Sequence, residues 1–276
     1  MSEEPRAIAL DYQPCRYGAS KLRFRGPGRA LDAPFIACLG GSETYGKFIA
    51  APWPALAEEA TGRRLVNFGC MNAGIDSYLG DAPTLATIAW ARGAIVQAMD
   101  AHTLSNRFYT VHPRRNDRFI RPAPALRDLY PEVDFTEFHF TRHMLSHLKA
   151  VSETRFETVR EELHSAWLAR MRALARALPE RRVLMVLPRP PAEIAALPEE
   201  ALGPGPLFVT PELVSEGGED FSATLTVVPG SAALAAGTEG MVFADLDAAA
   251  AAEMPGPTLH SEAAAQLAPV IDRVFG

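Results

Sequence analysis

The sequence predicts an α/β fold of three layers, in which helices cover both faces of a central parallel sheet. From residue 35 onward, short apolar segments alternate with stretches of helical periodicity, which is the order that builds such a sheet. The apolar segments are unbroken, as expected for strands buried on both faces. A chain of 276 residues, 48% of them hydrophobic, is long enough for one large core, so we expect a single domain with insertions.

The expected elements follow in order along the chain. The strands are expected at residues 35–39, 65–68, 94–99, 183–187 and 241–244. A long helix is expected at 153–178, because apolar residues recur there at helical spacing. These are Phe156, Val159, Leu163, Trp167, Met171, Leu174 and Leu178. Residues 188–239 are rich in Pro and Gly and predict an irregular segment with short elements such as 224–228.

Two helices are expected near the end of the chain. The alanine-rich run at 248–252 favours a helix over a low-complexity segment. The last helix is expected at 261–274, with Ser261 as its N-cap. Residues 1–34 are expected to form an N-terminal extension packed on the core, and residues 35–276 the domain itself, with an insertion near 107–150.

Composition limits the classes of function. A formal net charge of -6 argues against a protein whose whole surface binds nucleic acid or an anionic membrane. The N-terminus is acidic and no apolar run is long enough to cross a bilayer, so we expect a cytoplasmic protein. The odd number of cysteines, Cys15, Cys38 and Cys70, predicts reduced thiols and no disulfide framework.

The segment LGGSETYGK at residues 39–47 follows the first expected strand, at the sheet edge where open α/β folds bind ligands. Its residues 41–47 match the G-x-x-x-x-G-K pattern of a phosphate-binding loop, which would suit a phosphate or sulfate transferase. That pattern requires Ser or Thr next, where this chain has Phe48, and Pro52 and Pro54 would interrupt the helix it needs. We therefore keep it as an alternative.

The same segment also predicts a nucleophile turn that exposes the hydroxyl of Ser42. Residues 41–46, GSETYG, resemble the first block of the SGNH (GDSL-type) hydrolases, usually G-D-S-x-T-x-G, with Gly41 where the family has Asp. The resemblance implies an α/β/α fold and a catalytic role for Ser42. The alternative is that Ser42 only caps the following turn.

Further segments resemble the family in the same order. Residues 66–77 resemble its second block, which implies that Gly74, rather than Gly69, offers its backbone N–H to an oxyanion. An ordinary turn glycine is the alternative. The sequence LPRPP at residues 187–191 is similar to the proline-rich exit of the family's fourth strand.

His260, just before the last expected helix, lies where the family has its general base. The resemblance implies that His260 takes the proton from Ser42. The family has Asp three residues before this His, whereas this chain has Pro257. Loss of that acid can reduce kcat by about 10⁴, so another group would have to orient the imidazole. We consider for this role Asp245, Asp247, Glu262 or a backbone carbonyl.

The third block of the family, G-x-N-D, is replaced by DAHTLSN at residues 100–106. Asn106 or His102 would supply the side-chain donor to the oxyanion. We prefer Asn106, because a neutral amide donates without protonation. A surface-loop Asn is the alternative.

Basic residues and histidines follow the third strand. Arg107, Arg114 and Arg115 would suit an anionic substrate such as an acidic sugar or an acyl carrier group. The alternative is a solvated loop paired with Asp117 and Glu132. The histidines at 139, 143 and 147 are spaced by four and could bind a metal on one helix face, but we expect them to pack against apolar residues and predict no metal site.

These features favour a serine hydrolase that carries out ester hydrolysis or acyl transfer, such as acetyl transfer, on a small-molecule or carbohydrate substrate, without a cofactor. The oxyanion would be bound by the N–H groups of Ser42 and Gly74 and by Asn106. The alternative is a catalytically impaired binding module of the same fold for an anionic or sugar ligand, because the Asp and the third block are altered. The sequence predicts no oligomeric state.

Overall fold

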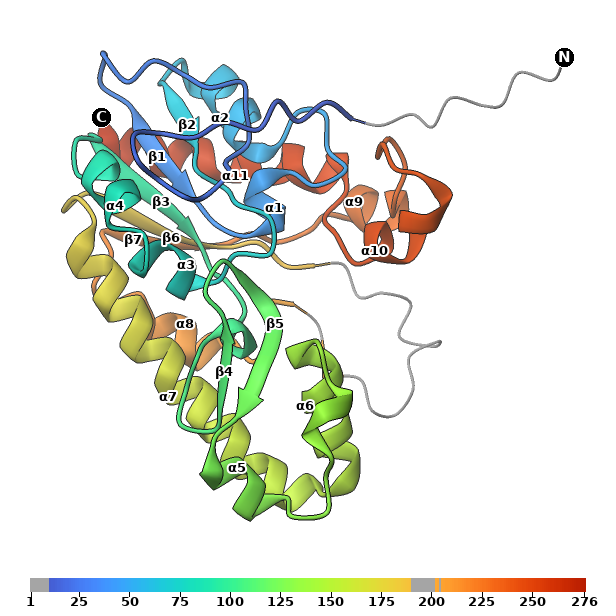
Figure 1. Ribbon diagram of the computed structural model, residues 1–276. Helices are drawn as coiled ribbons and strands as arrows, with labels where there is room; N and C mark the ends of the chain where they lie inside the picture. The colour runs from blue at the N-terminus through green and yellow to red at the C-terminus, as the bar shows by residue number, and fades with distance from the viewer. Residues whose placement is uncertain (1–9, 190–201, 204) are drawn as a thin grey trace, which may run out of the picture.

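A computed structural model of the protein describes residues 10–189, 202–203 and 205–276. A five-stranded parallel sheet forms the centre of the fold, with helices packed against it (Figure 1), as the sequence predicts. Its strand order is β2-β1-β3-β6-β7. The strands are β1 (Ile36–Leu39), β2 (Leu65–Asn67), β3 (Gly93–Gln97), β6 (Arg182–Val186) and β7 (Ala223–Thr226).

The chain order reverses direction across the sheet at β1. Ile36 of β1 is in register with Leu65 of β2 on one side and with Gly93 of β3 on the other. The chain therefore runs first to one edge and then to the other, and the connections after β1 and β3 diverge. Open α/β sheets bind their ligands in the crevice at such a point, beyond the carboxyl ends of the strands.

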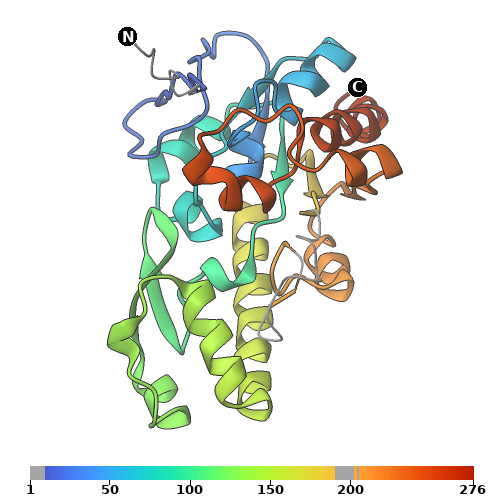
Figure 2. The ribbon, with the colours of Figure 1, turned by 90° about the vertical axis from the view of Figure 1, so that its right-hand side faces the viewer.

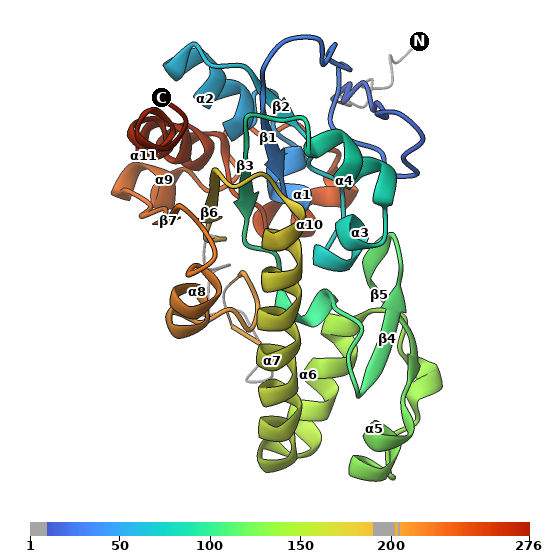
Figure 3. The ribbon, with the colours of Figure 1, turned by 90° about the vertical axis from the view of Figure 1, so that its left-hand side faces the viewer.

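Two helical layers cover the sheet, and alternate strand residues face each of them. Ile36 and Cys38 pack in a core cluster with α2 (Trp53–Thr61) and α11 (Pro257–Phe275). Ala37 and Leu39 belong to the larger cluster under the other layer. Figure 3 shows α2, α9 and α11 on one side of the sheet and α3, α4 and α7 on the other. The remaining bounds are α3 (Ile75–Leu79), α4 (Ala82–Ile88), α7 (Glu153–Ala177), α8 (Pro211–Gly217) and α9 (Ser231–Ala236).

The long helix α7 confirms the predicted apolar stripe. All seven residues named for that stripe are buried in the larger cluster. Trp167, fully buried, donates its Nε1–H to the carbonyl oxygen of Met99 at 2.8 Å, so its polar atom is satisfied. The helix thereby holds the chain just beyond β3 in place.

A hairpin and a helix extend away from the sheet between β3 and α7. The strands β4 (Tyr109–His112) and β5 (Arg115–Pro122) pair antiparallel, and α5 (Pro124–Leu129) and α6 (Thr141–Val151) follow. Figure 2 shows these green elements at the end of the molecule opposite the N-terminal segment. A short 3-10 helix, η1 (Ala101–Thr103), precedes β4, and a second, η2 (Phe135–Glu137), lies between α5 and α6.

The described part of the N-terminal segment packs on the body. Tyr17, Leu22 and Phe24 are buried in the larger cluster. The guanidinium of Arg25 donates to the backbone carbonyls of Tyr45, Gly46, Ile49 and Ala50. This segment therefore fixes the loop that follows β1.

Two expected elements differ in the structure. The predicted strand at 241–244 is wrong: the fifth strand is β7, and Val242 instead donates its N–H to the carbonyl of Phe48. Residues 223–226, ATLT, have a weaker apolar signal than residues 241–244, MVFA, so the apolar pattern favours the segment that does not pair with β6. The Ala-rich run forms α10 (Ala248–Ala252), after η4 (Asp245–Asp247).

The last helix begins at Pro257 instead of residue 261. Its N-cap is Gly256, and Pro257 occupies the first helical turn, where a missing N–H costs nothing. Ser261 is therefore not the N-cap, and its hydroxyl donates to the carbonyl of Pro257. His260 consequently lies within the helix and not in a loop before it.

The cysteines and the apolar character of the helices were examined over all described residues. The thiols of Cys15, Cys38 and Cys70 are free. Among helices in the described part of the chain, none combines the length and the apolar character needed to cross a membrane.

Candidate ligand-binding site

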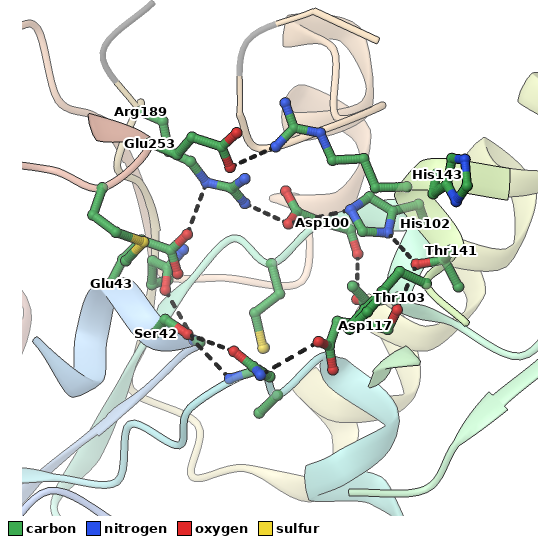
Figure 4. Close-up of a pocket in the computed structure, with 18 of the residues that line it drawn as sticks. Ser42, Glu43, Asp100, His102, Thr103, Asp117, Thr141, His143, Arg189 and Glu253 are labelled. Atoms are coloured by element: carbon green, nitrogen blue, oxygen red, sulfur yellow. Dashed lines mark hydrogen bonds and ion pairs between the residues drawn. The ribbon is translucent and has the colours of Figure 1, made fainter. Parts of the chain in front are cut away.

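A cavity of about 620 Å³ lies beyond the carboxyl ends of β1 and β3, at the point where the strand order reverses. We call it the Ser42 pocket (Figure 4). Its lining comprises Gly41, Ser42, Glu43, Asn72, Ala73, Gln97, Met99, Asp100, His102, Thr103, Asp117, Phe140, Thr141, Arg142, His143, Ser146, Arg189, Glu253 and Met254.

Ser42 begins α1 (Ser42–Tyr45), directly after β1, and its hydroxyl is held by Asn72. The hydroxyl donates to Asn72 Oδ1 at 3.3 Å and accepts the backbone N–H of Asn72 at 3.0 Å. Asn72 has a φ of 58°, a left-handed conformation that Asn tolerates better than most residues. Its Nδ2 donates to Asp117 Oδ2 at 3.3 Å. Sequence reasoning missed Asn72, although it lies inside the predicted second block.

Gln97, at the end of β3, fixes the turn that carries Ser42. Its Oε1 accepts from the N–H of Gly41 and from the hydroxyl of Thr44, each at 3.1 Å, and its Nε2 donates to the carbonyl of Ala98 at 2.8 Å. A Cβ at Gly40 would lie 2.1 Å from Thr44 Oγ1 and 2.4 Å from Gln97 Oε1. Glycine is therefore required at residue 40 by this close approach.

Arg189, just beyond β6, joins two carboxylates that come from distant parts of the chain. Its Nε donates to Glu43 Oε1 at 2.9 Å, and its Nη2 pairs with Asp100 Oδ2. The other oxygen of Asp100 accepts the N–H of Leu207 at 2.6 Å. Burial opposes ionisation of Asp100, but the charge of Arg189 and the hydrogen bonds of Arg189 and Leu207 outweigh the burial and lower the pKa of Asp100. Burial likewise opposes the charge of Arg189, whereas Asp100 and Glu43 raise its pKa.

His102 lies beside this ion-paired chain. Its Nδ1 is 3.0 Å from Thr141 Oγ1, and its Nε2 is 3.6 Å from Asp100 Oδ2. Burial lowers the pKa of His102 to about 4, more than the Asp100 charge raises it. The imidazole is therefore neutral at pH 7.

Charged and apolar groups complete the lining. Arg142 and Glu253 form an ion pair at 2.6 Å, and the ring of Phe140 is 44% exposed. Burial raises the pKa of Asp117, and its buried Oδ1 has no hydrogen-bond partner among the described residues. The lining thus holds four carboxyl groups and two guanidinium groups, and each guanidinium is already paired with a carboxylate.

The structure does not bring His260, the expected general base, to Ser42. The side chain of His260 is fully buried within α11 and does not line the Ser42 pocket. Its Nδ1 accepts the backbone N–H of Trp53 at 3.0 Å. Burial, with a smaller effect of Arg25, lowers the pKa of His260 to about 3. Of the acids considered as its partner, Glu262 instead accepts the N–H of Gly230.

Two of the three expected oxyanion donors, Gly74 and Asn106, are engaged elsewhere. The N–H of Gly74 donates to Asn116 Oδ1 at 2.7 Å. The side chain of Asn106 donates to the carbonyl of Leu104 and accepts the N–H groups of Phe108 and Tyr109, so it closes a local turn. Neither residue lines the Ser42 pocket.

The expected substrate-binding arginines also lie outside the pocket. Arg107 pairs with Glu162 at 3.1 Å. Arg114 and Arg115 are exposed at the hairpin turn, where their backbone N–H groups donate to His112. The arginines that line the pocket are Arg142 and Arg189. Arg189 lies in the predicted LPRPP segment, but that motif assigns it no role, and Arg142 lies in no motif.

The structure also places the three histidines that were considered as metal ligands. The ring of Phe138 lies 5.1 Å from that of His143 and 5.3 Å from that of His147, and His139 precedes α6. The described residues contain no group of three or more His, Cys, Asp or Glu that could hold a metal ion.

For the phosphate-loop alternative, α1 ends at Gly46 instead of starting there, and Lys47 lies over the ring of Phe48. Pro190 and Pro191, from the predicted proline-rich exit, lie outside the described residues.

Comparison with known proteins adds one family match. The family model "Domain of unknown function (DUF6473)" matches residues 1–275. No curated protein matches the sequence. A function is therefore proposed from the chemistry of the Ser42 pocket.

Proposed function

We propose that this chain, which belongs to the family Domain of unknown function (DUF6473), is a binding protein for a small polyhydroxylated ligand of the sugar type. The observation that carries the proposal is the chain of ion pairs Glu43–Arg189–Asp100, which fixes carboxylate and guanidinium groups around the Ser42 pocket. Preorganised polar groups bind a ligand without a further cost of ordering their side chains.

The mixture of donors and acceptors favours hydroxyl groups. Acceptor oxygens of Glu43 and Asp100 lie beside the N–H groups of Arg189, and the hydroxyl of Ser42 lies beside the amide of Asn72. A ligand hydroxyl both donates and accepts, so it matches such interleaved groups. A ligand with several hydroxyls would use several of these groups at once.

The charge balance disfavours an anionic ligand. Glu43, Asp100 and Glu253 are already paired with Arg189 or Arg142, so neither guanidinium is left to neutralise a ligand carboxylate or phosphate. An anion entering the pocket would also meet these carboxylates at short range. A neutral ligand avoids that repulsion.

The apolar part of the lining and the volume agree with a sugar. Ala73, Met99, Phe140 and Met254 offer apolar surface for the C–H face of a pyranose ring. A cavity of about 620 Å³ falls within the usual range of small-molecule sites. We therefore expect a ligand of one or two sugar rings.

Acyl hydrolysis or transfer through Ser42 is the second candidate, and the resemblance to SGNH hydrolases favours it. The specific observation in its support is the contact of Ser42 with the segment that resembles the family's second block, in which the N–H of Asn72 donates to Ser42 Oγ at 3.0 Å. Against it, the Ser42 hydroxyl donates to an amide oxygen, which is not a general base. A bound substrate would have to bring a base into reach.

The binding proposal is tested by titration calorimetry with neutral hexoses, myo-inositol and uronic acids. We expect saturable binding of at least one neutral polyol, weaker binding of the corresponding uronic acid, and at least tenfold weaker binding by Asp100→Asn. Arg114→Ala is the matched control, because Arg114 is exposed outside the pocket, and it should bind as the wild type does. Absence of binding across the panel, or preferential binding of uronic acids, would overturn the proposal.

A fluorophosphonate probe tests the second candidate on the same protein. The binding proposal predicts no covalent labelling of Ser42. Labelling that is lost in Ser42→Ala and kept in His260→Asn would instead establish a reactive serine that works without His260.

A further inference from the structure

The hydrogen bonds of Thr141 favour one of the two tautomers of His102. The hydroxyl of Thr141 donates to the backbone carbonyl of Asp117 at 3.1 Å, and this uses its only hydrogen. In its contact with His102 Nδ1, at 3.0 Å, Thr141 must therefore accept. The proton of the neutral imidazole is thus on Nδ1, and Nε2 carries a lone pair.

That lone pair faces another acceptor. Nε2 of His102 lies 3.6 Å from Asp100 Oδ2, a carboxylate oxygen that already pairs with Arg189. With the imidazole proton on Nδ1 and Asp100 Oδ2 paired with Arg189, no hydrogen of either residue lies between the two atoms. Both residues line the Ser42 pocket, and Figure 4 shows them side by side across from Ser42.

Neither acceptor is free to turn away. Asp100 is held at Oδ1 by the N–H of Leu207 and at its backbone carbonyl by the hydroxyl of Thr103. His102 is held at Nδ1 by Thr141, and its backbone carbonyl accepts the hydroxyl of Tyr109 at 2.8 Å. The two acceptors therefore keep their spacing, and a ligand must supply the hydrogens between them.

We propose that His102 Nε2 and Asp100 Oδ2 form a paired acceptor for two hydroxyls on neighbouring carbons of the ligand, a vicinal diol. This inference rests on the proposed function and names the group that the pocket recognises. Each hydroxyl donates its hydrogen to one acceptor. A single hydroxyl has one hydrogen and could donate to only one of the two acceptors.

Other donors fit this pair less well. A primary ammonium has enough hydrogens for both acceptors, but it would lie beside the guanidinium of Arg189, which already contacts Asp100 Oδ2. A metal ion would need a third ligand, and the described residues provide no such group of His, Cys, Asp or Glu. A neutral diol meets neither objection.

Two substitutions of His102 separate its two nitrogens. In His102→Asn the side-chain amide ends at the δ position, so it can still donate to Thr141 but presents no acceptor at the ε position. In His102→Gln the amide reaches the ε position and can present its oxygen there. Both variants would be compared with the wild type by calorimetry, using mannose, galactose, myo-inositol and their monodeoxy derivatives.

We expect a polyol that binds the wild type to bind His102→Asn at least tenfold more weakly and His102→Gln within about threefold of the wild-type value. Removal of the hydroxyl that donates to His102 Nε2 should weaken binding to the wild type at least tenfold but leave binding to His102→Asn nearly unchanged. Histidine ¹⁵N shifts of the free protein should place the His102 proton on Nδ1. Thermal unfolding shows whether each variant is folded.

The outcomes separate this inference from the proposed function. If no polyol binds the wild type, the proposed function fails and the paired acceptor fails with it. If polyols bind but His102→Asn binds them equally well, or if every deoxy derivative binds as its parent does, only the paired acceptor is overturned. Tighter binding of 2-amino sugars than of the parent sugars would overturn the choice of a diol, and a proton on Nε2 would overturn its geometry.

Discussion

Trp53 donates its backbone N–H to Nδ1 of His260, across 207 residues of sequence. This hydrogen bond ties the start of α2 to the first turns of α11, and both residues are fully buried. Nε2 of His260 has no partner among the described residues. His260 is thus a neutral, structural group, and its environment predicts how stability depends on pH.

We expect acid to destabilise the protein through His260. Burial lowers the pKa of this residue from 6.5 to about 3, so between these values the unfolded chain binds a proton that the folded chain does not. Stability should therefore fall as the pH decreases through this window, by at most about 1.4 kcal/mol per pH unit from this residue. His102, with its pKa lowered to about 4, acts in the same direction.

Urea denaturation at several values between pH 7 and pH 5.5 measures this effect. His260→Asn keeps an acceptor for the N–H of Trp53 but removes the titrating ring. It should be less stable than the wild type at pH 7, because it is smaller, yet show a shallower dependence on pH. An equally steep dependence in this variant would contradict the assignment.

Removal of Arg189 should be strongly destabilising. Arg189→Met leaves Glu43 and Asp100 as uncompensated charges, with side chains only 8% and 13% exposed, and we expect a loss of about 3–5 kcal/mol. Arg160→Met is the matched control, because its pair with Glu157 is exposed and should contribute less than about 1 kcal/mol. Chemical denaturation measures both, and similar losses in the two variants would be inconsistent with a buried ion-paired chain.

Because the backbone of Asn72 is left-handed, its Gly variant should be more stable than its Ala variant, which is the reverse of the usual order. Asn72→Ala has a Cβ that strains a φ of 58°, whereas Asn72→Gly does not, so Gly should be more stable by about 1 kcal/mol. The neighbouring Met71, which has no positive φ, serves as the control site, where Ala should be the more stable variant. The unfolding free energies of the four variants test this prediction. The same order of Ala and Gly at residues 71 and 72 would contradict it.

Gly40→Ala should disturb the turn that presents Ser42. The added Cβ would overlap Thr44 Oγ1 and Gln97 Oε1, and overpacking of this kind typically costs about 1–3 kcal/mol. The variant should also bind ligand more weakly, because Gln97 holds the N–H of Gly41. Gly28→Ala, whose nearest contact would be at 3.3 Å, should be tolerated better in both denaturation and binding measurements.

The parallel sheet could be predicted from the sequence because its central strands are continuous apolar runs, which periodicity detects directly. The edge strand was assigned to the wrong segment, since residues 223–226 are only partly buried and carry a weaker apolar signal than residues 241–244. The start of α11 was missed because Pro257, which can open a helix, was read only as the replacement for a family Asp.

The candidate site was predicted in part. Ser42 was identified because its turn is a contiguous motif. Its observed neighbours could not be found in this way, since Asp100 and Arg189 are separated by 89 residues and Arg189 and Glu43 by 146. Asn72 lies in a segment that was singled out, but its role depends on a backbone angle that the motif does not specify.

The ion pairs of Arg189 also bear on the order of folding. They join the chain after β1, β3 and β6, so they can form only when long loops have closed and three strands are paired. We therefore expect the binding site to be completed late, after the helices and the local hairpin. A ligand that binds this site should therefore lower the unfolding rate, whereas its presence during refolding should leave the folding rate nearly unchanged.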